Sequence, residues 1–140
     1  MNDVPTMLIV EDNPDDLDLL KRAIRRAAIE VRYDVATDGD AAVEALERVI
    51  ESGDRLPRVM LLDLKLPRRS GFEVLEWMKS NPPVRRVPVV VLTSSETSSD
   101  LARAYDLGAN SYLVKPVSAT ALTEMVEQIG AYWLRLNAVA

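Results

Sequence analysis

Neither cysteine nor histidine occurs among the 140 residues of the chain. The lack of cysteine excludes disulfides, thiolate metal sites and a cysteine nucleophile, and it fits a reducing compartment. The lack of histidine excludes a Ser-His-Asp triad, a histidine-ligated zinc ion and a histidine general base. Any chemistry must therefore rely on carboxylates, hydroxyls and lysine, together with a hard cation where a metal takes part.

Long apolar runs and a basic character are also missing. No run approaches the roughly 20 apolar residues that a membrane span needs, and Met1-Asn2-Asp3 lacks the basic and apolar regions of a signal peptide. A net charge of −5 and a pI of about 4.8 argue against a general nucleic-acid binder. We therefore expect a cytoplasmic protein with neither a membrane nor a nucleic acid as its partner.

Aromatic residues make up only 5% of the chain, whereas 48% of the residues are hydrophobic. The core must therefore consist mainly of Val, Leu, Ile and Ala. The length suits one domain and is too short for two ordinary ones. We predict a single domain over residues 1–140, with its core at about 6–130.

Five short apolar runs alternate with stretches of helical spacing. The runs cover residues 7–10, 31–35, 59–62, 89–92 and 112–114. Strands that are apolar on both faces and are separated by helices predict an α/β fold with a parallel sheet covered on both sides. Asn13-Pro14, Asp38 and Ser118 are suited to start three of the helices, and Gly53 and Gly108 to end two.

The fifth helix is expected to extend to about residue 136. Its apolar residues at helical spacing predict one common face, made of Leu122, Met125, Ile129, Trp133 and Leu136. The end of this face exceeds what a small domain needs to cover. Partial exposure of Tyr132, Trp133 and Leu136 would therefore suggest a dimer contact.

Polar residues stand at the ends of four of the predicted strands. Glu11-Asp12 follow the first, Asp63 the third, Thr93 the fourth and Lys115-Pro116 the fifth. In a sheet of this class, ligands bind beyond the carboxyl ends of the strands. Three carboxylates at one edge repel one another, and their oxygens favour a hard divalent cation, most plausibly Mg²⁺. A carboxylate nucleophile, a cation, a lysine and a hydroxyl are typical of phosphoryl transfer to an aspartate.

Taken singly, most of these residues have a plain structural interpretation as well. Asp12 is compatible with a simple turn before a helix, and Thr93 with a helix cap. Lys115 would serve equally as a solvated loop lysine, and Tyr112 as part of the core. Asp63 differs because it directly follows four apolar residues, where burial of a carboxylate without a partner is costly.

Together and in this order, Glu11-Asp12, Asp63, Thr93 and Lys115-Pro116 resemble the signature of response-regulator receiver domains, over about residues 6–130. The resemblance implies a flavodoxin-like, doubly wound sheet of order 2-1-3-4-5. It implies that Asp63 accepts the phosphoryl group and that Thr93 and Lys115 contact phosphoryl oxygens. Mg²⁺ would be held by Asp12 and Asp63 directly, by Glu11 through water and by the backbone carbonyl of Lys65.

The same resemblance implies further roles. Tyr112 would be the switch aromatic that turns inward with Thr93, Gly71 the loop glycine, and the peptide before Pro116 would be cis. Lys65 and Ser95 would tune the lifetime of the acyl phosphate. The surface that changes would be formed by helix 4, strand 5 and helix 5, and a homodimer would use it.

A narrower resemblance concerns the partner. Asn13-Pro14-Asp15-Asp16, the long connection over 51–58 and Tyr132-Trp133-Leu134 resemble stand-alone receivers that partner bacterial phytochromes. The phosphodonor would then be a light-sensing histidine kinase, with no output domain on this chain. Two rivals stay open. An aspartate-based phosphohydrolase generally has a second acid where this chain has Lys65, and a docking module would need none of the signature residues.

Overall fold

The computed structural model describes residues 4–139, so Met1-Asn2-Asp3 lie outside the described residues. Five strands form one parallel sheet: β1 (Thr6–Val10), β2 (Arg32–Ala36), β3 (Val59–Leu62), β4 (Val89–Thr93) and β5 (Ser111–Val114). Their order is β2-β1-β3-β4-β5. The predicted doubly wound, flavodoxin-like arrangement is therefore confirmed.

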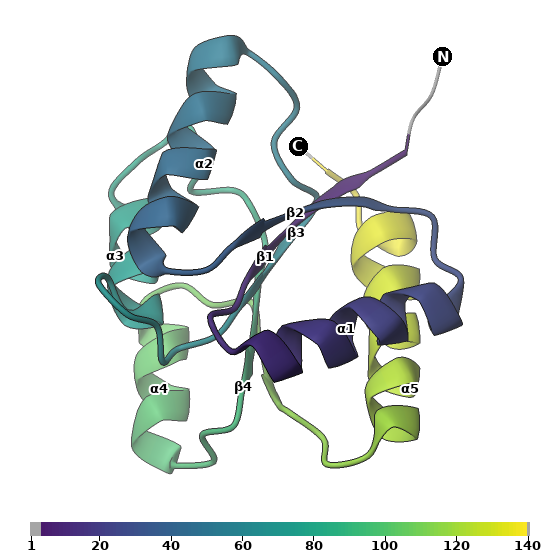
Figure 1. Cartoon of the computed structure of the whole chain (residues 1–140). Helices are drawn as coiled ribbons and strands as arrows, with labels where there is room; N and C mark the ends of the chain where they lie inside the picture. Colours follow the sequence, from purple (N-terminus) through teal and green to yellow (C-terminus); the bar gives the residue numbers. More distant parts are fainter. Residues whose placement is uncertain (1–3, 140) are drawn as a thin grey trace.

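The helices lie on both faces of this sheet. They are α1 (Pro14–Ala27), α2 (Gly39–Ser52), α3 (Gly71–Lys79), α4 (Ser98–Asp106) and α5 (Ala119–Ile129), with a π-helix η1 (Gly130–Leu136) directly after α5. Figure 1 shows α1 and α5 on one side of the sheet and α2, α3 and α4 on the other. Within residues 4–139, none of the helices has the length and apolar character to cross a bilayer.

Side-chain caps explain where the predicted helices begin. Asn13 accepts a hydrogen bond from the backbone amide of Asp16 at 3.0 Å, and Pro14 occupies the first turn, where its missing N–H is not needed. Asp38 and Ser118 cap α2 and α5 in the same way. These three predicted starts are confirmed.

The core consists of two apolar layers, one on each face of the sheet. Leu46 and Leu75 belong to the layer under α2–α4, and Trp77 packs against it. Ile9 and Val126 belong to the layer under α1 and α5, against which Trp133 packs. The central strands β1, β3 and β4 are buried on both faces, whereas β2 alternates between exposed and covered residues, as expected of an edge strand.

The predicted apolar face of the last helix is wrong at its end. The chain continues past Ile129 as a π-helix, in which each turn takes more residues than an α-turn. Leu134 is therefore the residue that returns to the core, at 6% exposure, while Leu136 is 75% exposed. The expected partial exposure of this end is confirmed, since Tyr132 is 50% exposed, Leu136 is 75% exposed and Trp133 is partly exposed.

The predicted cis peptide before Pro116 is also wrong. No peptide bond between residues 4 and 139 is cis. A trans bond remains the more stable isomer even before proline. The trans chain already brings the Lys115 ammonium to the carboxylates at the sheet edge.

Candidate functional site

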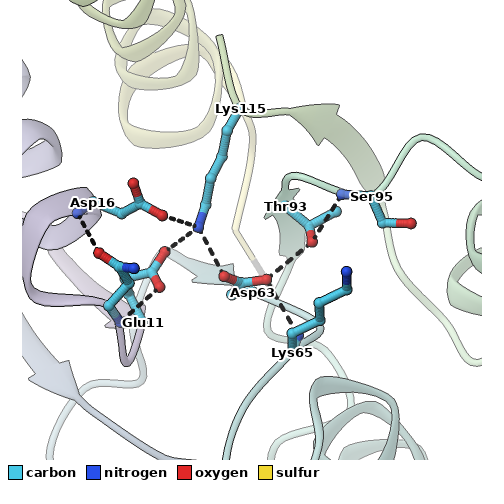
Figure 2. A network of polar contacts seen from close by, with 8 residues as sticks. Glu11, Asp16, Asp63, Lys65, Thr93, Ser95 and Lys115 are labelled. Atoms are coloured by element: carbon cyan, nitrogen blue, oxygen red, sulfur yellow. Dashed lines mark hydrogen bonds and ion pairs between the residues drawn. The ribbon is translucent and has the colours of Figure 1, made fainter. Parts of the chain in front are cut away.

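The register of the sheet brings the strand ends together. Val10 lies beside Leu62, and Thr93 beside Val114. The backbone ladder continues one step further, because the amide of Asp63 donates to Val10 O at 3.1 Å and the amide of Lys115 to Thr93 O at 2.8 Å. The residues that follow these strands therefore share one edge of the sheet, as Figure 2 shows.

Asp63 lies at the centre of this edge and is 7% exposed. Its Oδ1 accepts hydrogen bonds from the Thr93 hydroxyl at 2.9 Å and from the Lys65 amide at 3.2 Å. Its Oδ2 lies 2.8 Å from the Lys115 ammonium. A hydroxyl, an amide and a cation thus fix both oxygens, and the burial of this carboxylate is compensated.

Lys115 contacts three carboxylates at once (Figure 2). Its Nζ lies 2.6 Å from Glu11 Oε1, 2.8 Å from Asp63 Oδ2 and 2.9 Å from Asp16 Oδ2. Burial alone would lower the pKa of this ammonium, but the hydrogen bonds to Asp63, Glu11 and Asp16 outweigh it and raise the pKa above its ordinary value. Lys115 is therefore a cation at neutral pH and offsets part of the negative charge of these carboxylates.

Glu11 is buried at the same edge of the sheet, at 5% exposure. Burial raises the pKa of its carboxyl, while hydrogen bonds from Lys115 and from the backbone amide of Asn13 act in the opposite direction. Lys115 and the Asn13 amide therefore favour the ionised form of Glu11.

Three carboxylates are close enough to share one metal ion. One ligand oxygen each from Glu11, Asp12 and Asp63 lies within 4.8 Å of the others. Asp12 is exposed, whereas Glu11 and Asp63 are buried, so the cluster opens to solvent on the side of Asp12. An all-oxygen ligand set of this kind fits a hard divalent cation. The role of the Lys65 carbonyl stays a prediction, although its amide already contacts Asp63.

A chain of hydrogen bonds links the site to β5. The amide of Ser95 donates to Thr93 Oγ1 at 3.5 Å, and the Tyr112 hydroxyl donates to Ser95 O at 3.0 Å. The Ser95 hydroxyl also donates to Asp100 Oδ2 at 2.6 Å. Tyr112 therefore contacts the loop after Thr93 and makes no direct bond to Asp63.

The sequence reasoning missed Asp16 and Asp100. It looked for site residues in the strands and in the segments that directly follow them, but both of these acids lie in the first turns of helices. A signal was available for Asp16. It is the third residue after the cap Asn13, which places it one turn from the end of β1 and thus near the carboxyl edge of the sheet.

Comparison with known proteins finds one family model and several relatives that match most of the chain. The family model of the response regulator receiver domain matches residues 7–127. The probable methanogenesis regulatory protein FilR2 of Methanothrix harundinacea is 46% identical over 132 residues, which cover 94% of this chain and 84% of that protein. Response regulator Rcp1 of Synechocystis sp. is 37% identical over 134 residues, which cover 95% and 91%.

Solved structures of such regulators have the same fold. The Mn²⁺-bound form of Rcp1 is similar with a TM-score of 0.85 at 34% identity, covering 97% of this chain and 99% of that one. The phosphorylated cyanobacterial phytochrome response regulator RcpA is similar with a TM-score of 0.86 at 33% identity, covering 97% and 98%. With the family model spanning most of its length, the chain belongs to the response-regulator receiver family of two-component signalling.

Proposed function

We propose that this chain is a phosphorylation-dependent signalling switch in which Asp63 accepts a phosphoryl group from a histidine kinase. The observation that carries the proposal is the set of contacts made by the Asp63 carboxylate. One of its oxygens faces the Lys115 ammonium and the other the Thr93 hydroxyl, at the sheet edge where ligands bind. The phosphorylated relative RcpA supports this reading.

The chemistry follows from these contacts. An oxygen of Asp63 attacks the phosphorus of the donor phosphohistidine, so an O–P bond forms while the P–N bond breaks. The electron pair of that bond returns to the donor imidazole, which takes a proton from solvent. Lys115 and Thr93 then hydrogen-bond phosphoryl oxygens, where negative charge gathers. No turnover of a separate small molecule is expected.

Divalent metal binding belongs to the same proposal. Glu11, Asp12, Asp63 and the Lys65 carbonyl would hold Mg²⁺, and the bound ion would neutralise charge on the phosphoryl oxygens. The carboxylate cluster and the Mn²⁺-bound structure of the relative Rcp1 support this assignment.

Acetyl phosphate tests the proposal directly. With Mg²⁺, we expect at most one acyl phosphate per chain, which then decays slowly. Chelation of the metal with EDTA should slow labelling by about a hundredfold, which corresponds to ~3 kcal/mol of lost charge stabilisation. Intact-protein mass spectrometry and release of inorganic phosphate measure the two quantities.

The same experiment separates the rival functions. Sustained release of phosphate at many turnovers per chain would identify a phosphohydrolase. Complete absence of label, with the protein folded and Mg²⁺ present, would identify a docking module. Labelling that EDTA leaves unchanged would contradict the metal assignment alone.

The expected output is a change of the surface formed by α4, β5 and α5. Drawing Thr93 toward a phosphoryl group would alter the hydrogen bonds through Ser95 to the Tyr112 hydroxyl. That shift would bias the loop before α4 and the ring of Tyr112 toward a second arrangement. A second copy of this chain is the proposed partner of this surface.

Leu101→Glu tests the homodimer. Leu101 lies on α4 and is 40% exposed. A charge there should weaken dimerisation in the presence of Mg²⁺ and beryllium trifluoride by about tenfold, since a buried charge without a partner is costly in an interface. Sedimentation equilibrium measures the dissociation constant.

Ile50→Glu is the matched control, because Ile50 is 38% exposed but lies on α2. It should leave dimerisation unchanged. A wild-type protein that stays monomeric at high concentration with the phosphate mimic would remove the homodimer from the proposal.

The proposed phosphodonor is a histidine kinase of the phytochrome type. RcpA is described as a phytochrome response regulator, and another similar structure, at 38% identity and a TM-score of 0.76, as a bacteriophytochrome response regulator. The two similarities extend over 97% and 98% of this chain. Rates of phosphotransfer from candidate kinases with and without a bilin chromophore would decide between a light-sensing donor and another one.

A further inference from the structure

The loop between β3 and α3, residues 64–70, begins directly after Asp63 and contains Lys65. Its two ends are tied together, because the amide of Gly71 donates to Leu64 O at 3.0 Å. A Cβ atom on Gly71 would overlap the carbonyl oxygen of Asp63. The two ends of the loop are therefore held close together. The position of its tip, residues 67–69, depends on the contacts that these residues make.

The tip of this loop lies against the start of α2. The amide of Gly39 points at Pro67 O, with a separation of 3.4 Å. A Cβ atom on Gly39 would overlap the carbonyl group of Arg69. The φ of Gly39 is not in the left-handed region, so its conformation alone does not require glycine. Glycine is required because any side chain would overlap Arg69.

Two ion pairs flank this contact. Arg69 Nε lies 3.2 Å from Asp40 Oδ1, and Arg68 Nε lies 3.5 Å from Asp38 Oδ2. Arg68 itself has a left-handed φ of 65°, which is unfavourable for a side chain of this size. The Arg68 side chain is 69% exposed, so its ion pair is screened by water and contributes little by itself. The contact at Gly39 and the less exposed ion pair between Arg69 and Asp40 therefore restrain the tip of the loop together.

We propose that Gly39, at the start of α2, is a positioning residue for the metal site. The close approach of Gly39 to Arg69, together with the ion pair between Asp40 and Arg69, holds the loop in a path that would keep the carbonyl of Lys65 near the carboxylate cluster. This inference rests on the proposed function, because it needs Lys65 as a metal ligand. Helix α2 contributes no ligand, but through Gly39 it would control the affinity of the site for the metal ion.

Gly39→Ala, compared with Gly53→Ala, tests the inference. The added Cβ of Gly39→Ala must push the carbonyl of Arg69 away, whereas a Cβ at Gly53 meets no atom within 4 Å. Gly53 has a φ of 74°, so alanine there strains the backbone without displacing the loop. Both variants lose stability, which makes the second a control for destabilisation alone.

Calorimetric titration with Mg²⁺ in the absence of any phosphodonor supplies the readout. The dissociation constant for Mg²⁺ should rise by about tenfold in Gly39→Ala, the size of effect seen when support for a ligand is lost. It should stay unchanged in Gly53→Ala. Equal affinity in Gly39→Ala and the wild type overturns the inference, and so does an equal loss of affinity in both variants.

Exchanging the charges of Arg69 and Asp40 tests the inference even if Gly39→Ala does not fold. Arg69→Asp places like charges beside Asp40 and should weaken Mg²⁺ binding, and adding Asp40→Arg should restore it. Failure of the exchange to restore affinity overturns the inference. Normal labelling of the wild type by acetyl phosphate keeps the proposed function intact in that case, whereas a wild type that binds no Mg²⁺ removes the inference together with the metal assignment.

Discussion

Asp63→Asn should carry no acyl phosphate after incubation with acetyl phosphate and Mg²⁺, a loss of at least about a thousandfold in labelling, because an amide cannot replace the carboxylate nucleophile. The variant should fold normally. Asparagine keeps the shape of Asp63 and still accepts the hydrogen bond from Thr93, and Lys115 keeps Glu11 and Asp16 as partners. Mass spectrometry of the intact protein measures the label, and thermal unfolding checks the fold.

Asp54→Asn is the matched control for this experiment. Asp54 is an exposed acid in the connection between α2 and β3, so it lies before the start of β3, whereas Asp63 follows the other end of that strand. Its amide variant should be labelled like the wild type. Label that survives in Asp63→Asn would place the acceptor elsewhere, with Asp12 the first candidate because it is the exposed carboxylate of the cluster.

Lys115→Met should lower the free energy of unfolding by about 3 kcal/mol when no divalent metal is present. The side chain of Lys115 is 16% exposed and lies within ion-pair distance of Glu11, Asp16 and Asp63. Methionine fills a similar volume but leaves buried carboxylates without a cation. Saturating Mg²⁺ should restore most of the loss, because the ion neutralises the same groups. Urea unfolding with EDTA and with Mg²⁺ measures both values.

Labelling by acetyl phosphate should also slow in Lys115→Met, by about a hundredfold, since a charge-stabilising donor is lost. Lys65→Met is the control, because the Lys65 side chain is exposed and its proposed ligand is a backbone carbonyl. Its unfolding free energy should change by less than about 0.5 kcal/mol. A Lys115→Met protein as stable as the wild type in EDTA would contradict the view that this ammonium stabilises the buried carboxylates.

Most of the fold could be predicted because its signals are local. The runs around residues 59–62 and 89–92 are apolar without interruption, which identifies central strands, and the caps Asn13 and Asp38 mark helix starts. The C-terminal π-helix could not be predicted in this way. An α-helical spacing placed Leu136 on the same face as Ile129, but the wider turns of η1 bring Leu134 to the core instead.

The candidate site was predictable to the extent that strand ends define it. Glu11, Asp63, Thr93 and Lys115 meet because parallel strands end at one edge. Asp16 joins them from a helix, and only the crossing of α1 over the sheet decides which of its acids reaches Lys115. The isomer of the peptide before Pro116 depends on the tertiary setting of one bond, and no local pattern reveals it.

The two apolar layers of the core each have their own chromophore. The two tryptophans of the chain are divided between them, with Trp77 against the layer under α2–α4 and Trp133 against the layer under α1 and α5. Intrinsic fluorescence therefore reports on both faces of the sheet at once. Replacing either indole by phenylalanine would separate the two signals and show whether the faces lose their packing in one cooperative transition.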